Sequence, residues 1–183
     1  MKLFRKQIPP EEAGARLYEA LRSSVAAPGG ELSLARLVGR LGGNPDQFPE
    51  QYIGEVMVGV MFAASLAVER STSGWLAAEI LRGMRAEFLR HLREQGALPE
   101  QVDEWERILF SRSGDYRRTL QGYAELEPPW KLGRQFLWAV TGVEDYTALP
   151  VKFATLYLLA ARDRAQEVLN ACGPQIRVVP PVM

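Results

Sequence analysis

One apolar stretch, from Ile53 to Val68, limits what this chain can fold into more than any other part of the sequence. The stretch reads IGEVMVGVMFAASLAV, and its polar side chains are Glu55 and Ser65. Because its apolar residues do not share one face, a helix here must be enclosed on all sides, either by protein or by a membrane. The uninterrupted apolar run from Val56 to Ala64 is far shorter than the roughly 20 residues that cross a bilayer. We therefore predict a central core helix over Glu50–Arg70 and no membrane span.

The length and composition of the chain are typical of one globular domain. A chain of 183 residues is long enough to bury about 70% of its unfolded surface. Hydrophobic residues make up 47% of it and charged residues 24%, which is far from a disordered composition. We expect a single helical domain over 1–183, in which 1–9 and 174–183 are extended arms.

Prolines and glycines divide the rest of the chain into helices. Proline is tolerated in the first turn of a helix, and glycine commonly follows the last turn. The predicted fold class is all-α, a single-domain bundle of about seven or eight helices around the central apolar helix. The other predicted helices begin after Pro9-Pro10, cover Leu32–Leu41 and Ser73–Gln95, begin at Pro99 with a break at Ser113-Gly114-Asp115, begin after Pro128-Pro129, and cover Tyr146–Ala171.

The helix after Pro128-Pro129 carries a candidate interface residue. Its inward face is predicted to hold Trp130, Gly133, Phe136, Leu137 and Val140. Trp138 lies instead on the side of Lys131 and Arg134, where part of the indole is expected to be exposed. Exposed tryptophans often anchor interfaces. The alternative is a rim residue that folds back against Leu149 or Pro150.

The two ends of the chain are apolar where soluble domains usually place polar residues. The arm Lys2–Ile8 contains leucine and phenylalanine, and the other arm contains Ile176, Val178 and Val179. Ordering a free arm costs about 1–2 kcal/mol per residue, so an ordered arm has to bury apolar area. The arms are expected either to pair with each other or to dock on a neighbouring subunit, which makes the three aliphatic residues interface candidates.

A glutamate–histidine pocket is the second candidate site. His91 is the only histidine, and Glu87 lies one turn before it, placed to hydrogen-bond the imidazole and raise its pKa. Together with Glu55 these residues are ligand-binding candidates; the alternative is a half-buried histidine satisfied by its neighbour. A di-metal carboxylate site needs a Glu-x-x-His motif on each of two helices, whereas this chain has Glu-x-x-x-His once. We therefore expect no metal and no cofactor.

Charge and motif content exclude several function classes. Lys plus Arg and Asp plus Glu number 22 each, so no net charge attracts nucleic acid or an acidic membrane. Pro45 and Pro49 interrupt the segment that most resembles a helix-turn-helix, and no nucleic-acid binding is expected. One cysteine leaves no disulfide framework. The basic N-terminus lacks a following apolar region, so it is not a secretory signal, and a cytoplasmic location is expected.

The sequence carries no recognisable catalytic motif, and we assign no catalytic residue. The leading hypothesis is a non-catalytic helical module that binds a protein partner or assembles with copies of itself. The alternative hypothesis is a small-molecule-binding helical protein, or an enzyme, that uses the glutamate–histidine pocket. Metal content and ligand-induced stabilisation would favour the alternative, and a concentration-dependent mass would favour assembly.

Overall fold

Seven α-helices account for most of the chain that the structure, a computed structural model, describes: residues 7–42, 50–72, 74–121, 130–143 and 147–176. The helices pack against one another as one helical domain, so the predicted all-α fold class is confirmed. They are α1 (Pro10–Ala26), α2 (Leu34–Arg40), α3 (Glu50–Ser71), α4 (Gly74–Glu94), α5 (Pro99–Gln121), α6 (Trp130–Thr141) and α7 (Ala148–Cys172), followed by a 3-10 turn, η2 (Gly173–Gln175).

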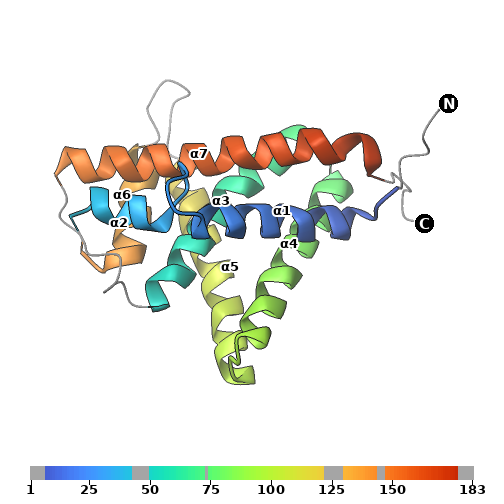
Figure 1. The fold of residues 1–183 in the computed structure, drawn as a ribbon, viewed down its shortest axis with the longest axis horizontal. Helices are drawn as coiled ribbons and strands as arrows, with labels where there is room; N and C mark the ends of the chain where they lie inside the picture. The colour runs from blue at the N-terminus through green and yellow to red at the C-terminus, as the bar shows by residue number, and fades with distance from the viewer. Residues whose placement is uncertain (1–6, 43–49, 73, 122–129, 144–146, 177–183) are drawn as a thin grey trace.

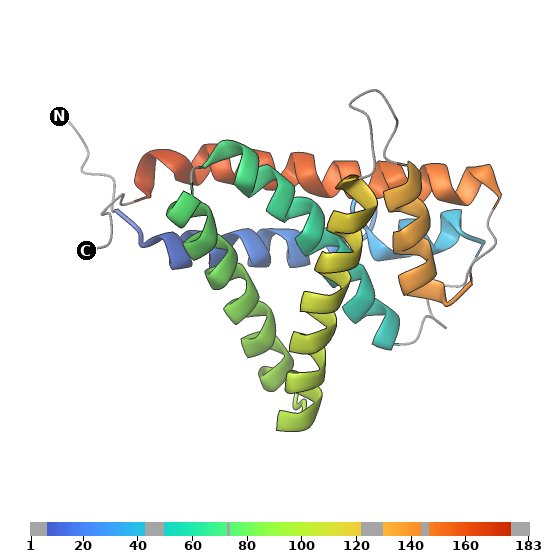
Figure 2. The same cartoon turned by 180° about the vertical axis from the view of Figure 1, so that it is seen from behind.

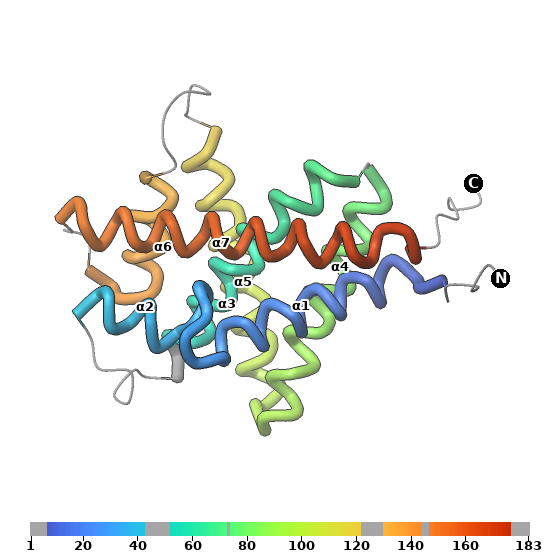
Figure 3. The backbone as a smooth tube through the Cα atoms, turned by 45° about the horizontal axis from the view of Figure 1, so that its top comes forward, coloured from blue at the N-terminus to red at the C-terminus, as the bar shows by residue number. Residues whose placement is uncertain are grey.

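Helices α7 and α1 run side by side and antiparallel, and together they form one layer of the molecule (Figure 1). Helices α4 and α5 form a V whose closed end projects away from this layer, as the view from behind shows (Figure 2). Helix α3 lies in the middle and packs against α1, α4, α5, α6 and α7. Both α6 and α2 lie beside the first half of α7 (Figure 3).

Helix α3 is the enclosed helix that the apolar stretch predicts. Every residue from Val56 to Ser65 is buried, and the Ser65 hydroxyl donates a hydrogen bond to the Phe62 carbonyl, 2.7 Å away. By length and composition the segment Tyr52–Ser71 is apolar enough to cross a membrane, a test that core helices of soluble proteins also pass. Because 67% of that window is buried inside the molecule, α3 serves here as the core. The absence of a membrane span stays a prediction.

The closest helix crossing is between α1 and α4, and two glycines make it. A Cβ atom added at Gly83 would lie 2.7 Å from the Cα of Glu11, and one added at Gly14 would lie 2.6 Å from the backbone nitrogen of Met84. The two backbones are therefore in contact at this point. Gly59 has a related role in α3, because its missing side chain leaves room for the ring of Phe136.

The predicted break at Ser113-Gly114-Asp115 is wrong, because α5 continues through it to Gln121. A glycine inside a helix costs only about 1 kcal/mol relative to alanine. Against this, the next turn places Tyr116 in the core, fully buried, with its ring centroid 4.9 Å from that of Phe62. Burying a large side chain contributes about 1.5–3 kcal/mol, which outweighs the local preference for a break.

The predicted pairing of the two arms is present at one point in the described residues. The backbone N–H of Ile8 donates to the carbonyl of Gln175 at 2.9 Å, and Ile8 forms an isolated bridge with Ile176. Ile8 is buried and Ile176 is half-buried. The prediction that the chain is extended from residue 174 is wrong at its first residues, because Gly173–Gln175 form the short 3-10 turn. Val178 and Val179 lie outside the described residues.

Candidate functional site

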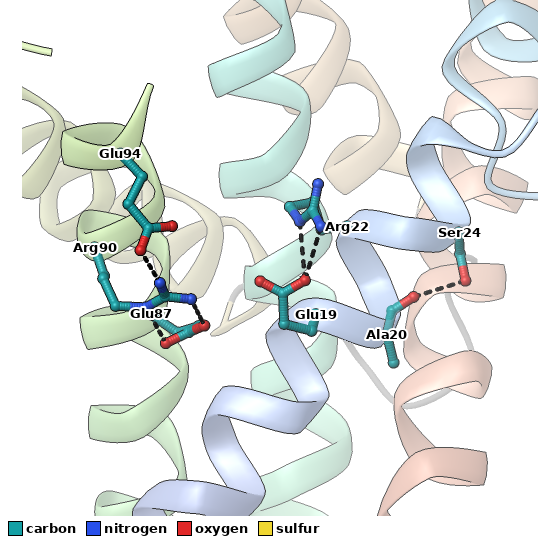
Figure 4. Close-up of polar contacts among 7 residues, drawn as sticks. All are labelled: Glu19, Ala20, Arg22, Ser24, Glu87, Arg90 and Glu94. Carbon is teal, nitrogen blue, oxygen red and sulfur yellow. Dashed lines mark hydrogen bonds and ion pairs between the residues drawn. The ribbon is translucent and has the colours of Figure 1, made fainter. Parts of the chain in front are cut away.

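The predicted hydrogen bond between Glu87 and His91 is absent, because the carboxylate of Glu87 accepts hydrogen bonds from Arg90 instead. Both oxygens of Glu87 accept from Arg90, with Nε at 2.9 Å, and Arg90 also pairs with Glu94 one turn on (Figure 4). A bidentate guanidinium–carboxylate pair is stronger than a single bond to an imidazole. The hydrogen bond from Arg90 holds the pKa of Glu87 below its ordinary value. His91 is half-buried, and its ring centroid lies 6.2 Å from that of Tyr18.

Glu55 does not join Glu87 and His91 but pairs with Arg112 of α5. Three hydrogen bonds of 3.0–3.3 Å join the two side chains, of which 12% and 23% are exposed. The guanidinium also lies over the ring of Trp138, 5.0 Å from its centroid. The hydrogen bond to Glu55 raises the pKa of Arg112. This cluster ties α3, α5 and α6 together. A ligand site at Glu87 and His91 stays a prediction.

Trp138 is accordingly half-buried under Arg112. The predicted alternative, packing against Leu149 or Pro150, stays a prediction. Tyr116 lies one turn after Arg112, and burial raises the pKa of its hydroxyl. Among the described residues no group of three or more His, Cys, Asp or Glu side chains is close enough to hold a metal ion. The cluster around Arg112 joins three helices through an ion pair and a cation–π contact.

Replacing Arg112 by methionine tests how strongly this cluster stabilises the fold. The change leaves the Glu55 carboxylate largely buried without its cation, and we expect a loss of about 2 kcal/mol in urea denaturation, less than the roughly 3–5 kcal/mol of a fully buried pair. The double variant Arg112→Met with Glu55→Gln should recover most of the loss. The control is Arg107→Met, because Arg107 and Glu104 form an exposed pair, which contributes at most about 1 kcal/mol. Equal effects of the two methionine variants would contradict the burial argument.

An open pocket of about 430 Å³ lies between α6 and α7. Helix α6 can lie directly on α7 because Gly133 has no side chain; a Cβ there would be 2.9 Å from the backbone nitrogen of Thr155. Trp130, one turn earlier, forms a wall of the pocket. Trp130 is 41% exposed, so the prediction that it lies on the inward face is wrong. As the first residue of α6, it lies at the edge of the contact with α7. The other lining residues include Arg134, Val151, Lys152, Thr155 and Leu156.

A second pocket, of about 360 Å³, lies between α2 and α7. The guanidinium of Arg40 lies over the ring of Phe153, 5.1 Å from its centroid, and both residues line the pocket. Arg36 also lines it, and so do two acidic residues, Glu31 and Asp163. Leu156 lines both pockets, so the two lie next to each other on α7.

Exposed apolar side chains are frequent in α6, in α7 and in the segment between them. Among the described residues, four of the seven exposed large hydrophobic side chains lie between residues 130 and 156. Leu149 is 58% exposed and Leu156 is 45% exposed; they are two turns apart on one stripe of α7. Exposed apolar side chains grouped on one face of a helix are typical of an interaction site. We define the outer face of α7 as Leu149, Lys152, Phe153, Leu156 and Ala160.

Sequence reasoning missed this surface although its signal was present. The run Phe153–Ala161 is apolar all round. Its buried half includes Ala154, Leu158 and Ala161, and the other half faces outward. When a helix is apolar on two faces, either protein covers both faces or one apolar face is left exposed.

The comparison with protein-family models gave no match, and neither did the searches among curated proteins and solved structures. The site is therefore interpreted from its own geometry.

Proposed function

We propose that this protein is a non-catalytic binding module that holds an apolar, acidic segment of another protein between α6 and α7. The observation that carries the proposal is the pocket walled by Trp130, with exposed leucines beside it. Tryptophan and arginine are the residues most enriched at the energetic centres of interfaces. The apolar surface continues along α7 to Leu149, beyond the pocket itself, which suits a polypeptide better than a small ligand.

The charges at the pocket support a partner that carries carboxylates. Lys152 lines it with its side chain exposed, and none of its lining residues within the described parts of the chain is acidic. Complementary charges at the rim of an interface speed association and suppress wrong partners. The same charge disfavours a second copy whose two-fold axis passes beside Lys152, since the two lysines would then approach each other.

The chemistry of the lining supports a binding role over a catalytic one. Thr155 is the described lining residue that has a hydroxyl, and this group donates to the carbonyl of Val151 at 2.8 Å. Over the residues that the structure describes, the lining has no histidine, cysteine or carboxylate that would act as a base or nucleophile.

The test is selection from a random peptide library displayed on phage, followed by fluorescence anisotropy with the enriched peptides. We expect these peptides to combine apolar or aromatic anchors with Asp or Glu. Leu156→Glu should weaken their binding at least about tenfold, as expected for loss of an interface anchor. Leu98→Glu is the matched control, because Leu98 is also exposed but lies between α4 and α5; it should leave binding unchanged.

Two outcomes would overturn the proposal. One is the absence of peptides that distinguish the wild type from Leu156→Glu. The other is a dimer, seen by light scattering at tens of micromolar, that Leu156→Glu dissociates, since the surface would then bind a second copy of the chain.

A further inference from the structure

We infer that the partner segment is an α-helix that crosses α7 over Leu156 and places apolar side chains in both pockets. This inference rests on the proposed function and extends it from one pocket to two.

The arrangement of α7 residues around Leu156 carries the inference. Lys152 and Thr155 line the pocket on the α6 side, whereas Phe153 and Ala160 line the pocket on the α2 side. Leu156 thus forms a ridge with a hollow on each side. Helices pack by placing the ridges of one into the grooves of the other, and a ridge between two hollows matches two side-chain rows of a second helix.

The backbone requirements of the partner favour a helix over a strand. A peptide that binds as a strand needs the unpaired backbone groups of a sheet edge. In the described parts of the chain the secondary structure is helical, apart from the bridge of Ile8 with Ile176, so neither pocket has such an edge. A helix satisfies its own backbone groups and presents side chains three, four and seven residues apart on one face.

The two pockets differ in charge, and this difference sets the character of the partner helix. Among the described residues, the exposed Lys152 and no carboxylate line the α6 side, whereas Glu31 and Asp163 line the α2 side beside Arg36 and Arg40. Asp163 also accepts hydrogen bonds from its neighbour Arg162, at 2.7 and 3.0 Å. We therefore assign the acidic residues of the partner helix to the α6 side, and its uncharged anchors to the α2 side.

The experiment compares two peptide libraries with the same variable residues, one on a helical frame and one on a proline-rich extended frame. The helical library should yield the tighter binders, with Asp or Glu next to the anchors. A proline in the middle of the best helical peptide should weaken its binding at least about tenfold, because proline breaks a helix interior. Circular dichroism should show helicity increasing on binding.

Two variants of the protein test the contribution of each pocket to binding separately. Lys152→Glu alters the α6 side, and Ala160→Gln adds uncharged bulk on the α2 side. We expect each to weaken the selected helical peptide at least about fivefold, since each removes complementarity at one pocket. Circular dichroism and thermal melting confirm that each variant is folded.

The outcomes distinguish this inference from the proposed function. If Lys152→Glu and Leu156→Glu weaken binding while Ala160→Gln does not, the α6 pocket binds alone; the two-pocket inference then fails and the proposed function stands. If the extended library gives the tighter binders, the helical partner is excluded. If Leu156→Glu leaves peptide binding unchanged, both the two-pocket inference and the proposed function fail.

Discussion

An alanine in place of Gly83 should lower the free energy of unfolding by about 2 kcal/mol, although alanine is the better helix former. Its Cβ would lie 2.7 Å from both the Cα and the carbonyl carbon of Glu11, which are backbone atoms and cannot rotate away. Helices α1 and α4 must therefore separate. Overpacking of this severity costs about 3 kcal/mol, and the higher helix propensity of alanine offsets about 1 kcal/mol of it. Urea denaturation followed by circular dichroism measures the net loss.

Gly39 provides a matched control for this substitution. It also lies inside a helix, α2, but an added Cβ would have no atom within 4 Å. Gly39→Ala should therefore stabilise the protein by about 0.5–1 kcal/mol. The double variant Gly14→Ala with Gly83→Ala should lose less than the sum of the single losses, because both residues lie at one crossing. Equal stability of Gly83→Ala and Gly39→Ala would show that the two backbones are not in contact.

Removing the ring of Phe62 should lower the free energy of unfolding by about 3–5 kcal/mol. Phe62 is 2% exposed in the middle of α3, and its ring packs on that of Tyr116. The variant Phe62→Ala would leave a cavity between α3 and α5 that neither helix can fill without moving. The shift of the urea midpoint relative to the wild type gives the loss.

Phe110→Ala removes the same atoms from the surface and serves as the control. Phe110 is 58% exposed, and its ring centroid is 4.9 Å from the guanidinium of Arg85. Losing an exposed cation–π contact should cost about 0.5–1 kcal/mol. Similar losses for the two phenylalanine variants would mean that α3 is a peripheral helix and that the core lies elsewhere.

The position of the core could be predicted from the sequence because the apolar stretch leaves α3 no exposed face. The same reasoning fails for α7, since an apolar run does not reveal which of its faces another helix covers. Val151 and Leu156 are both aliphatic, but one is buried under α6 and the other is exposed. Which one is covered depends on the close contact at Gly133, and this contact joins residues of two different helices.

Local signals misled the prediction where two of them competed. Gly114 favours a break in α5, but the buried ring of the next turn outweighs it. Glu87 has both Arg90 and His91 within one helical turn, and the sequence alone does not say which of them binds its carboxylate. The structure resolves the choice in favour of the guanidinium, whose two N–H groups fit a carboxylate. Each pocket is lined by residues of separate helices, so no local pattern indicates it.

The contact between Ile8 and Gln175 determines when, during synthesis, the first helix reaches its final surroundings. Ile8 precedes α1, but the carbonyl that accepts its N–H belongs to residue 175, which follows α7. At synthesis rates of about 5–20 residues per second, the partner is added roughly 10–30 s later. Helix α4 is translated before α7, so α1 can pack against α4 first, and the antiparallel layer with α7 forms last. Ile8 and Gln175 are therefore joined only after α7 has been translated.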